Sequence, residues 1–284
     1  MWTPAFACPE CGGGLAGVFC LGCGRMYRER DGIWRYLTAA RLAALEPFLR
    51  HYRVVREREG RRRRAADYYR ALPVVDRRDP HATEWHIRRE TYRQLLNGCL
   101  ASAPNPSRVL DLGAGCGWLS HRLAELGHHV VSLDILDDET DGLGAVRHYA
   151  EPFPAVQADF DRLPFAPEQF DVVVFNGSLH YARDVAATLW SARRVLARGG
   201  ALVVMDSPMF PSSVDGDAMM ARRADVVHGA GYVTYAGLDA IAAALGLRAS
   251  FTASRGPVTW RLRRQVARLR LGRAPAAFGL WVAR

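Results

Sequence analysis

The sequence contains no lysine, so all 38 of its basic residues are arginine, and against 29 acidic residues they give a formal charge of +9. The complete lack of one residue type is typical of coding bias in a GC-rich genome, so arginine by itself identifies no binding site. Two segments hold the excess: residues 53–64 carry a net +5 and residues 261–273 a net +6, which leaves −2 for the rest. The positive charge is therefore confined to two local patches.

Long apolar runs are also absent. The most apolar stretches, "DVVVF" and "ALVVM", have the length of a strand and not the roughly 18–20 residues of a membrane-spanning helix. The start, "MWTPAFACPE", shows no basic segment followed by an apolar one, so we expect no signal peptide and a cytoplasmic protein. With 49% hydrophobic and 24% charged residues, the composition is that of a globular protein with a core.

The chain divides into three predicted parts. Residues 1–37 are rich in glycine and cysteine and form a predicted zinc ribbon. Residues 38–103 carry apolar side chains at intervals of three and four residues, which predicts a helical lid or connector. The segment "ASAPNPS" is a linker, because its prolines resist both helix and sheet. Residues 104–284 form the third part, the predicted catalytic domain.

In the third part, strand-like and helix-like segments alternate. Predicted strands occupy 108–112, 129–134, 154–159, 170–176, 201–206, 248–254 and 276–284. Predicted helices occupy 118–127, 184–200 (ended by a glycine pair) and 234–247. This alternation predicts an α/β fold, a Rossmann-like and mostly parallel sheet with helices on both faces.

A glycine-dense turn, "DLGAGCG" at 111–117, follows the first of these strands. Glycines at such a turn let a ligand approach bare backbone, and here they are Gly113, Gly115 and Gly117. The spacing is G-x-G-x-G, which differs from the G-x-G-x-x-G of dinucleotide-binding loops. The turn therefore favours a nucleoside-bearing ligand other than a dinucleotide.

Three acidic residues mark the ends of the first three strands. Asp111 would repel a pyrophosphate but attract the ammonium group of an amino-acid-bearing ligand. Asp134 lies where a carboxylate accepts both ribose hydroxyls, and Asp159 lies in position for an adenine amino group. Together they indicate a ligand made of an amino acid and adenosine.

With these motifs the sequence resembles the class I S-adenosylmethionine-dependent methyltransferases. "VLDLGAGCGWLSHRLAELGHHVVSLD", "QADFDRLPF", "FDVVVFNGSLHY" and "ARRVLARGGALVVMD" match that family's motifs in order, from about 108 to 206. The resemblance implies a seven-stranded sheet and S-adenosyl-L-methionine as cofactor. The alternative is a plain nucleotide-binding Rossmann domain. The donor-binding residues that the resemblance implies are Asp111, Gly113, Gly115, Gly117, Asp134, Ile135, Asp159, Phe160 and Asn176.

Two Cys-x2-Cys units lie eight residues apart near the start, Cys8 with Cys11 and Cys20 with Cys23. Two facing units of this kind form a tetrahedral four-thiolate site suited to Zn²⁺, whose binding would supply folding energy to a segment with little core. Disulfides, rubredoxin-like iron and redox pairs are the alternatives. The segment also resembles zinc ribbons of methyltransferases, including bacterial rRNA guanine-N1 methyltransferases, although histidine is typically the fourth ligand there.

Candidate catalytic residues follow the fourth strand. The donor's sulfonium already makes its methyl group electrophilic, so the protein has only to place a nucleophile and, for some acceptors, remove a proton. His180 is the candidate base and Tyr181 the candidate for orienting the acceptor, with helix capping or packing as alternatives. Candidate acceptor-binding residues, with helical packing as the alternative, are Tyr69, Trp85, His86, Arg88 and Asp206.

The predicted function is methyl transfer from S-adenosylmethionine to an oxygen, nitrogen or carbon atom of a small-molecule acceptor. The alternatives are an RNA base methyltransferase of the guanine-N1 kind and a non-catalytic donor-binding adaptor. On a helix, the apolar residues of 261–273 would share one face beside arginines, which suits RNA phosphates, an anionic membrane or a solvated insertion.

Overall fold

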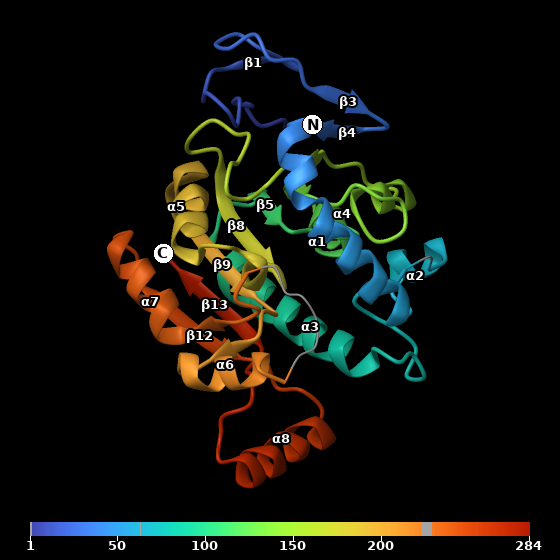
Figure 1. The fold of residues 1–284 in the computed structure, drawn as a ribbon, viewed down its shortest axis with the longest axis vertical. Helices are drawn as coiled ribbons and strands as arrows, with labels where there is room; N and C mark the ends of the chain where they lie inside the picture. Colours follow the sequence, from blue (N-terminus) through green and yellow to red (C-terminus); the bar gives the residue numbers. More distant parts are fainter. Residues whose placement is uncertain (1, 63, 223–228) are drawn as a thin grey trace.

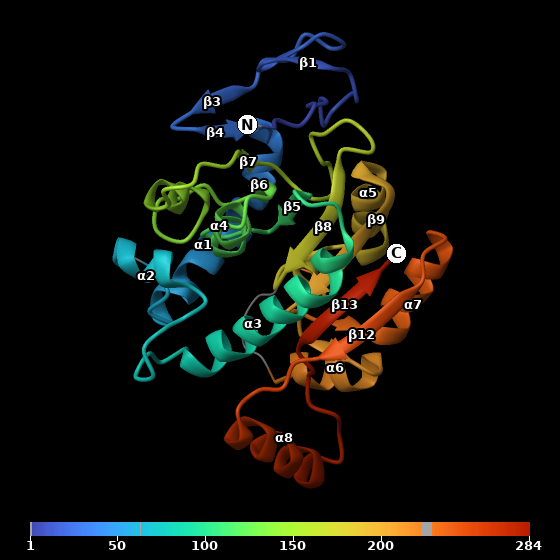
Figure 2. The same ribbon diagram turned by 180° about the vertical axis from the view of Figure 1, so that it is seen from behind.

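The computed structural model describes residues 2–62, 64–222 and 229–284 of the chain. A nine-stranded sheet runs through the centre, in the order β12-β13-β9-β8-β5-β6-β7-β4-β3 (Figures 1 and 2). Two short two-stranded sheets accompany it, β1 with β2 and β10 with β11. Within the described residues, no helix has both the length and the apolar character needed to cross a membrane.

Seven of the nine strands are the ones predicted, and they confirm the expected fold. Their bounds are β5 Arg108–Leu112, β6 His129–Asp134, β7 Ala155–Gln157, β8 Phe170–Asn176, β9 Leu196–Met205, β12 Ala249–Ala253 and β13 Gly279–Ala283. β5 to β9 are parallel, and β13 inserts antiparallel between β9 and β12. The ends of β5, β6, β7, β8 and β9 therefore meet at one edge of the sheet, where ligands bind in open parallel sheets.

The other two strands come from the segment that was predicted as a ribbon. β3 Arg28–Arg30 and β4 Ile33–Arg35 form a hairpin, and β4 pairs parallel with β7. The hairpin covers the backbone groups that β7 would otherwise leave unpaired. Ile33 packs with Ala155 and Leu143 beneath it. The expected seven-stranded sheet is thus extended to nine, and the ribbon segment is part of the main body.

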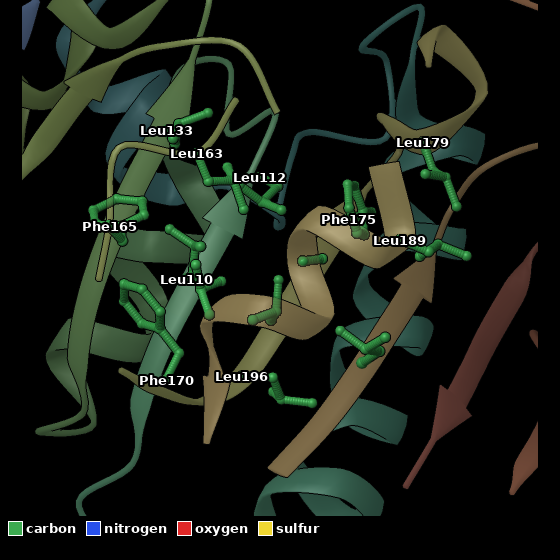
Figure 3. Packing of buried hydrophobic residues seen from close by; sticks show 14 of the residues in the cluster. Leu110, Leu112, Leu133, Leu163, Phe165, Phe170, Phe175, Leu179, Leu189 and Leu196 are labelled. Carbon is green, nitrogen blue, oxygen red and sulfur yellow. The ribbon is translucent and has the colours of Figure 1, made fainter. Parts of the chain in front are cut away.

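The two faces of the sheet bury two separate apolar clusters. Alternate strand residues point to opposite faces, so Leu110 belongs to one cluster and Val109 to the other. Figure 3 shows the first face, where strand side chains meet Leu189 of α5 Val185–Val195. α7 Tyr235–Ala244 covers the same face. α3 Ala82–Gln94 and α4 Trp118–Glu125 cover the other.

The predicted helix 184–200 ends earlier than expected. α5 stops at Val195, and the chain passes directly into β9, so the glycine pair lies inside the strand. Gly199 has a φ of 74°, and a Cβ on Gly200 would lie 2.8 Å from the carbonyl oxygen of Asp171. Gly199 is favoured by its positive φ and Gly200 by the close approach of β8, and neither ends the helix.

Three helices lie between the β3–β4 hairpin and β5, within the segment that was predicted to be helical. α1 Ala39–Arg58 begins at Thr38, whose side chain accepts a hydrogen bond from the amide of Arg41. α2 Ala66–Ala71 and α3 follow, and α3 continues through a π-helical turn, Leu95–Cys99, and a 3₁₀ turn, Leu100–Ser102. Leu45 and Leu49 of α1 pack on Leu136 beyond β6, which anchors the helix over the sheet.

The remaining elements are short or lie near the end of the chain. They are β1 Leu15–Ala16, β2 Phe19–Cys20, 3₁₀ turns Leu143–His148 and Leu179–Tyr181, β10 Met209–Phe210, α6 Ser213–Met220, β11 Val233–Thr234 and α8 Val258–Leu271. α8 is inserted between β12 and β13 and stands off the body of the protein (Figures 1 and 2).

Candidate active site

The glycine turn after β5 adopts a conformation that favours glycine. Gly113, Gly115 and Gly117 have φ values of 72°, 54° and 73°. A Cβ at Gly113 would lie 2.3 Å from the Cβ of Ser178, so the turn approaches the loop after β8 more closely than any other residue would allow. Gly117 begins α4 and packs toward Phe153, away from the cavities described below.

Asp134 ties the end of β6 to this turn. The amide of Gly115 donates to Asp134 Oδ2 over 2.8 Å, and the amide of Leu136 donates to Oδ1 over 2.8 Å. Burial raises the pKa of Asp134 to about 6, although these amide hydrogen bonds oppose the rise. The carboxylate is thus held rigidly beside the bare backbone of the glycine turn.

Asp111 lies beneath the turn and is fully buried. The Ser120 hydroxyl donates to its Oδ2 over 2.9 Å, whereas Oδ1 has no hydrogen-bond partner among the described residues. Burial raises the pKa of Asp111 to about 7. Asn176, at the end of the neighbouring strand, likewise has a buried Oδ1 without a partner in the described part of the chain. Asn176 lines one of the cavities described below, so its oxygen is available to a ligand or an ordered water, whereas Asp111 lines none of them.

Two cavities of about 80 Å³ each adjoin Gly113 and Gly115. The first brings together the predicted residues Asp134, Ile135, Phe160 and Tyr181. The second brings together Tyr69, Trp85, Arg88 and Asn176. Tyr52 of α1 lines both, so this helix closes over the predicted donor site. The bare turn, the rigid carboxylate and the unpaired oxygens fit S-adenosylmethionine.

Asp159 is engaged by the chain itself. Nε of Arg41 donates to Asp159 Oδ2 over 2.7 Å, and Nη2 donates to the same oxygen, while Oδ1 accepts the amide of Asp161. Its neighbour Phe160 stacks edge-on against Phe175 with ring centres 6.0 Å apart. The predicted contact of Asp159 with adenine therefore stays a prediction, because Arg41 of α1 occupies this carboxylate.

A third cavity, of about 550 Å³, lies beside the donor site; we call it the acceptor cavity. It shares Gly177, Tyr52, Arg56 and Arg88 with the donor-side cavities. Its predicted members are His180, Tyr181, Arg88 and Asp206. The other lining residues come mainly from α1 and α3, from the segment between them and from α8; those used below are Phe48, Tyr52, Arg56, Arg61, Glu84 and Trp260.

Arginines and acids alternate around the acceptor cavity. Arg56 binds Asp141 through two hydrogen bonds, of 2.5 and 2.6 Å. Glu84 lies between Arg88, at 3.0 Å, and Arg61. Burial alone would raise the pKa of Glu84, but the two guanidinium groups outweigh it and lower that pKa to about 2. Arg61 also contacts Glu59, at 2.7 Å. The three arginines of the lining, Arg56, Arg61 and Arg88, are thus matched by three acidic residues, Glu59, Glu84 and Asp206.

Asp206 is held in a strained conformation at the end of β9. Its φ is 55°, in the left-handed region that residues with a Cβ rarely adopt, and it is 6% exposed. The Thr91 hydroxyl donates to Oδ1 over 2.8 Å, whereas Oδ2 has no partner among the described residues. Burial raises the pKa of Asp206 to about 6, although the positive charge of Arg88 acts to lower it.

His180 and Tyr181 lie on the turn after β8, as predicted. Nδ1 of His180 is 3.3 Å from the hydroxyl of Ser207, the residue after Asp206. The Tyr181 ring packs with Phe48 and Tyr52 at 5.9 and 6.0 Å between centres. His180 is therefore placed to contact an acceptor, and Tyr181 joins an aromatic wall contributed by α1.

The other predicted acceptor residues are mostly engaged in packing. Tyr69 is 2% exposed and its hydroxyl donates to the carbonyl of Thr140. Trp85 donates from Nε1 to the Tyr68 hydroxyl over 3.0 Å, and Arg88 lies over its ring at 5.1 Å. His86 lies on α3 and lines none of the three cavities described above.

Several residues of the site were not predicted, among them Phe48, Tyr52 and Arg56 of α1. These three are spaced four residues apart, so they lie on one face of the helix and reach the cavities together. The spacing could have shown from the sequence that these side chains act together. Arg56, however, belonged to the segment 53–64, which was interpreted as a charged patch. Only the packing of α1 across the sheet showed that the face is turned inward.

Five of the six arginines that the structure describes in segment 53–64 are paired within the protein, and the sixth, Arg58, is exposed. Arg53 and Arg62 contact Asp138, Arg56 contacts Asp141, Arg61 contacts Glu84, and Arg64 contacts Asp79. Arg63 lies outside the described residues. The segment therefore fastens α1 and the following turn to the acidic loop after β6 and to the start of α3.

The four predicted cysteine ligands are brought together. Their Sγ atoms all lie within 4.8 Å of one another, with Cys8 to Cys23 at 3.8 Å and Cys11 to Cys20 at 3.5 Å. Tetrahedral thiolates at the usual Zn–S distance lie about 3.8 Å apart, so the cluster fits a zinc ion. The hydroxyl of Tyr27 is 3.1 Å from Cys8 Sγ and is placed to support that ligand.

Comparison with known proteins matches residues 110–204 to the family described as methyltransferase domain. The demethylmenaquinone methyltransferase of Beutenbergia cavernae is 37% identical over 116 residues, which cover 40% of this chain and 46% of that protein. The malonyl-(acyl-carrier protein) O-methyltransferase of Legionella pneumophila is 30% identical over 100 residues, which cover 34% of this chain and 35% of that protein. The chain thus spans less than half the length of these relatives.

The fold is also similar to a solved structure along most of its length. The 1,6-didemethyltoxoflavin-N1-methyltransferase of Burkholderia thailandensis, solved with 1,6-didemethyltoxoflavin and S-adenosylhomocysteine, aligns with a TM-score of 0.51 and 17% identity. The alignment covers 93% of this chain and 96% of that one. Residues 110–204 thus match a methyltransferase domain, and the strand order and the glycine turn agree with the fold of the class I S-adenosylmethionine-dependent methyltransferases.

Proposed function

We propose that the protein transfers a methyl group from S-adenosylmethionine to an oxygen, nitrogen or carbon atom of a small molecule held in the acceptor cavity. The cavity itself carries this proposal. Its volume of about 550 Å³ suits one small organic molecule, and it adjoins the donor-side cavities through Gly177. The sequence relatives are named for different acceptors, whereas the lining of the cavity is a property of this chain.

The donor would be held by residues that the fold has already oriented. Asp134 presents its carboxylate toward ribose, and Gly113 and Gly115 leave the backbone open to the methionine end. Asp111 and Asn176 contribute unpaired oxygens near that end. When bound, the donor supplies a methyl group that is already electrophilic, so the protein needs to position the acceptor and manage its proton.

The lining of the acceptor cavity favours a planar molecule. Phe48, Tyr52, Tyr181 and Trp260 offer aromatic surface. Arg61 and Arg88 line the cavity beside the carboxylates of Glu59, Glu84 and Asp206. Arginine guanidinium groups bind carboxylates and phosphates through two parallel hydrogen bonds. We therefore propose a planar aromatic compound as the acceptor class; a carboxylate or phosphate on it would compete with Glu59 and Glu84 for these arginines.

Two groups are placed to accept a proton from the acceptor. Asp206 has an unpaired Oδ2 at the cavity wall, and with a pKa of about 6 it is mostly ionised at neutral pH. His180 lies on the same wall with Nδ1 near Ser207. We propose Asp206 as the base, because its oxygen is buried without a partner, and His180 as a contact that orients the acceptor.

The cysteine cluster has a structural role in this proposal. Zinc bound by Cys8, Cys11, Cys20 and Cys23 would hold the ribbon against the first face of the sheet, where Cys8 and Cys20 join the main apolar cluster. The cluster contributes no residue to the acceptor cavity. Loss of zinc is therefore expected to reduce stability before it reduces methyl transfer.

RNA is the second candidate acceptor, supported mainly by the arginines of α8, because most arginines of the basic segment 53–64 are paired within the protein. The test is to incubate the protein and methyl-labelled donor separately with total RNA and with a small-molecule extract of the source cells. We expect label in the extract, with none in a parallel reaction of the Asp134→Ala variant. Label confined to RNA would overturn the proposed acceptor class, and no label in either fraction would support a non-catalytic adaptor.

A further inference from the structure

α8 presents an apolar face to solvent. Val258, Leu262, Val266 and Leu269 are 59%, 56%, 45% and 84% exposed. Their spacing of four, four and three residues places them within about 80° of the helix circumference. Scattered exposed aliphatic residues are ordinary, but four on one face of a helix that stands off the body are a candidate contact surface (Figures 1 and 2).

Arginines border this face on both sides. Arg261 and Arg268 are seven residues apart and lie along one flank, and Arg263 and Arg270 lie along the other. All four are exposed, and none forms an ion pair among the described residues. The chain contains no acidic residue after Asp239. The surface is therefore apolar at its centre and uniformly positive at its edges.

The opposite side of α8 faces the protein. Arg264 lies over the Trp260 ring at 4.4 Å and donates to the carbonyls of Pro275 and Ala276. Trp260 packs on Gly256 and lines the acceptor cavity. These contacts fix the rotation of the helix, so that the apolar face points away from the body.

We propose that α8 docks the protein on an anionic membrane surface. A helix with aliphatic residues on one face and arginines on both flanks buries that face among acyl chains while the guanidinium groups reach the lipid phosphates. RNA would engage the arginines but leave four aliphatic side chains in water, and the helix's aromatic ring is turned toward the body. A second copy of the chain would bring two rows of arginine together.

The test measures co-sedimentation of the full chain with vesicles of phosphatidylcholine and with vesicles that contain about one-third phosphatidylglycerol. We expect binding to the anionic vesicles that weakens as salt is raised, and little binding to phosphatidylcholine. Exchanging Arg261 and Arg268 for glutamine should weaken binding about fivefold for each arginine. The matched control is Arg50→Gln with Arg58→Gln, on exposed positions of α1, which should bind as the unaltered protein does.

The apolar face is tested by Leu262→Gln with Leu269→Gln, which should weaken vesicle binding at least tenfold. Both positions are exposed, so the fold is expected to be unchanged, as circular dichroism would show. Leu126→Gln, at an exposed leucine beyond α4, is the control. The proposal is overturned if the protein ignores anionic vesicles, binds both vesicles equally, or binds a fluorescent RNA and neither vesicle. These measurements need no donor or acceptor and are independent of the proposed function.

Discussion

The amide of Gly115 donates a hydrogen bond to Oδ2 of Asp134 across 2.8 Å, joining the turn after β5 to the end of β6. The glycine turn and the carboxylate are thus positioned by one another, and hydrogen bonds within the protein hold the proposed donor site together. A carboxylate at this position can accept both ribose hydroxyls of the donor.

Replacing Asp134 with alanine should therefore weaken donor binding about a hundredfold, because two charge-assisted hydrogen bonds and the anchor of the turn are lost together. Isothermal titration calorimetry with S-adenosylmethionine measures the effect. Asp137→Ala is the control, since that aspartate lies three residues away and pairs with Arg35 at the surface. Unchanged affinity in the Asp134 variant would refute the proposed donor site.

Asp111 predicts a pH dependence of stability. Its folded pKa of about 7 lies above the ordinary value of 3.8, so between these values the folded state binds more protons than the unfolded state. Its contribution to the free energy of unfolding therefore falls as pH rises from about 4 to 7. Asp111→Asn should stabilise the protein at pH 8 by a free energy of order 2 kcal/mol, and by little at pH 4.

Urea unfolding of the natural protein and the Asp111→Asn variant at both pH values measures this difference. The asparagine can still accept the hydrogen bond from Ser120, so packing is expected to be kept. An equal stability difference at pH 4 and pH 8 would show that ionisation of Asp111 plays no part. The same variant should bind donor less tightly, since the amide attracts the donor's ammonium group less than a carboxylate does.

Asp206→Asn should lower kcat about a hundredfold while donor affinity stays within twofold, because its unpaired oxygen faces the acceptor cavity. With its pKa at about 6, the rate of the natural enzyme should rise with pH as this carboxylate loses its proton. The variant should lack that rise. A variant that keeps both the rate and the pH profile would remove Asp206 from the mechanism.

His180 is predicted to orient the acceptor. His180→Ala should raise KM for the acceptor about tenfold and change kcat less, with donor binding unaffected. His81→Ala is a suitable comparison, because His81 lines the far part of the same cavity and its Nε2 lies 2.7 Å from the carbonyl of Glu59. If His180→Ala lowers kcat a hundredfold with KM unchanged, the roles of His180 and Asp206 have to be exchanged.

The cysteine cluster predicts one zinc ion per chain by elemental analysis. Cys20→Ser should reduce the bound zinc and lower the melting temperature, because the ribbon has little apolar core of its own. Cys99→Ser is the control, since Cys99 is buried in the other apolar cluster, far from the four cysteines in sequence. Full zinc content in the Cys20 variant would contradict the assignment.

Local patterns were sufficient to predict most of the sheet. The predicted strands 108–112, 129–134 and 170–176 coincide with β5, β6 and β8, because a buried parallel strand is a short apolar run with clear ends. The pairing of β4 with β7 had no such signal. It depends on which sheet edge the ribbon reaches, and that is a contact between distant segments.

The sequence by itself was sufficient to predict a methyltransferase domain, its donor and a zinc site, because these predictions depend on short motifs: a glycine turn, Asp134 at a strand end, and two cysteine pairs. Tertiary structure alone decided which arginines remain available. Most of those of 53–64 are paired with acids brought from 79 to 141, whereas those of α8 meet no acid among the described residues. Similar net charges, +5 and +6, thus lead to mostly paired arginines in one patch and an open surface in the other, since charges are neutralised by their neighbours in space.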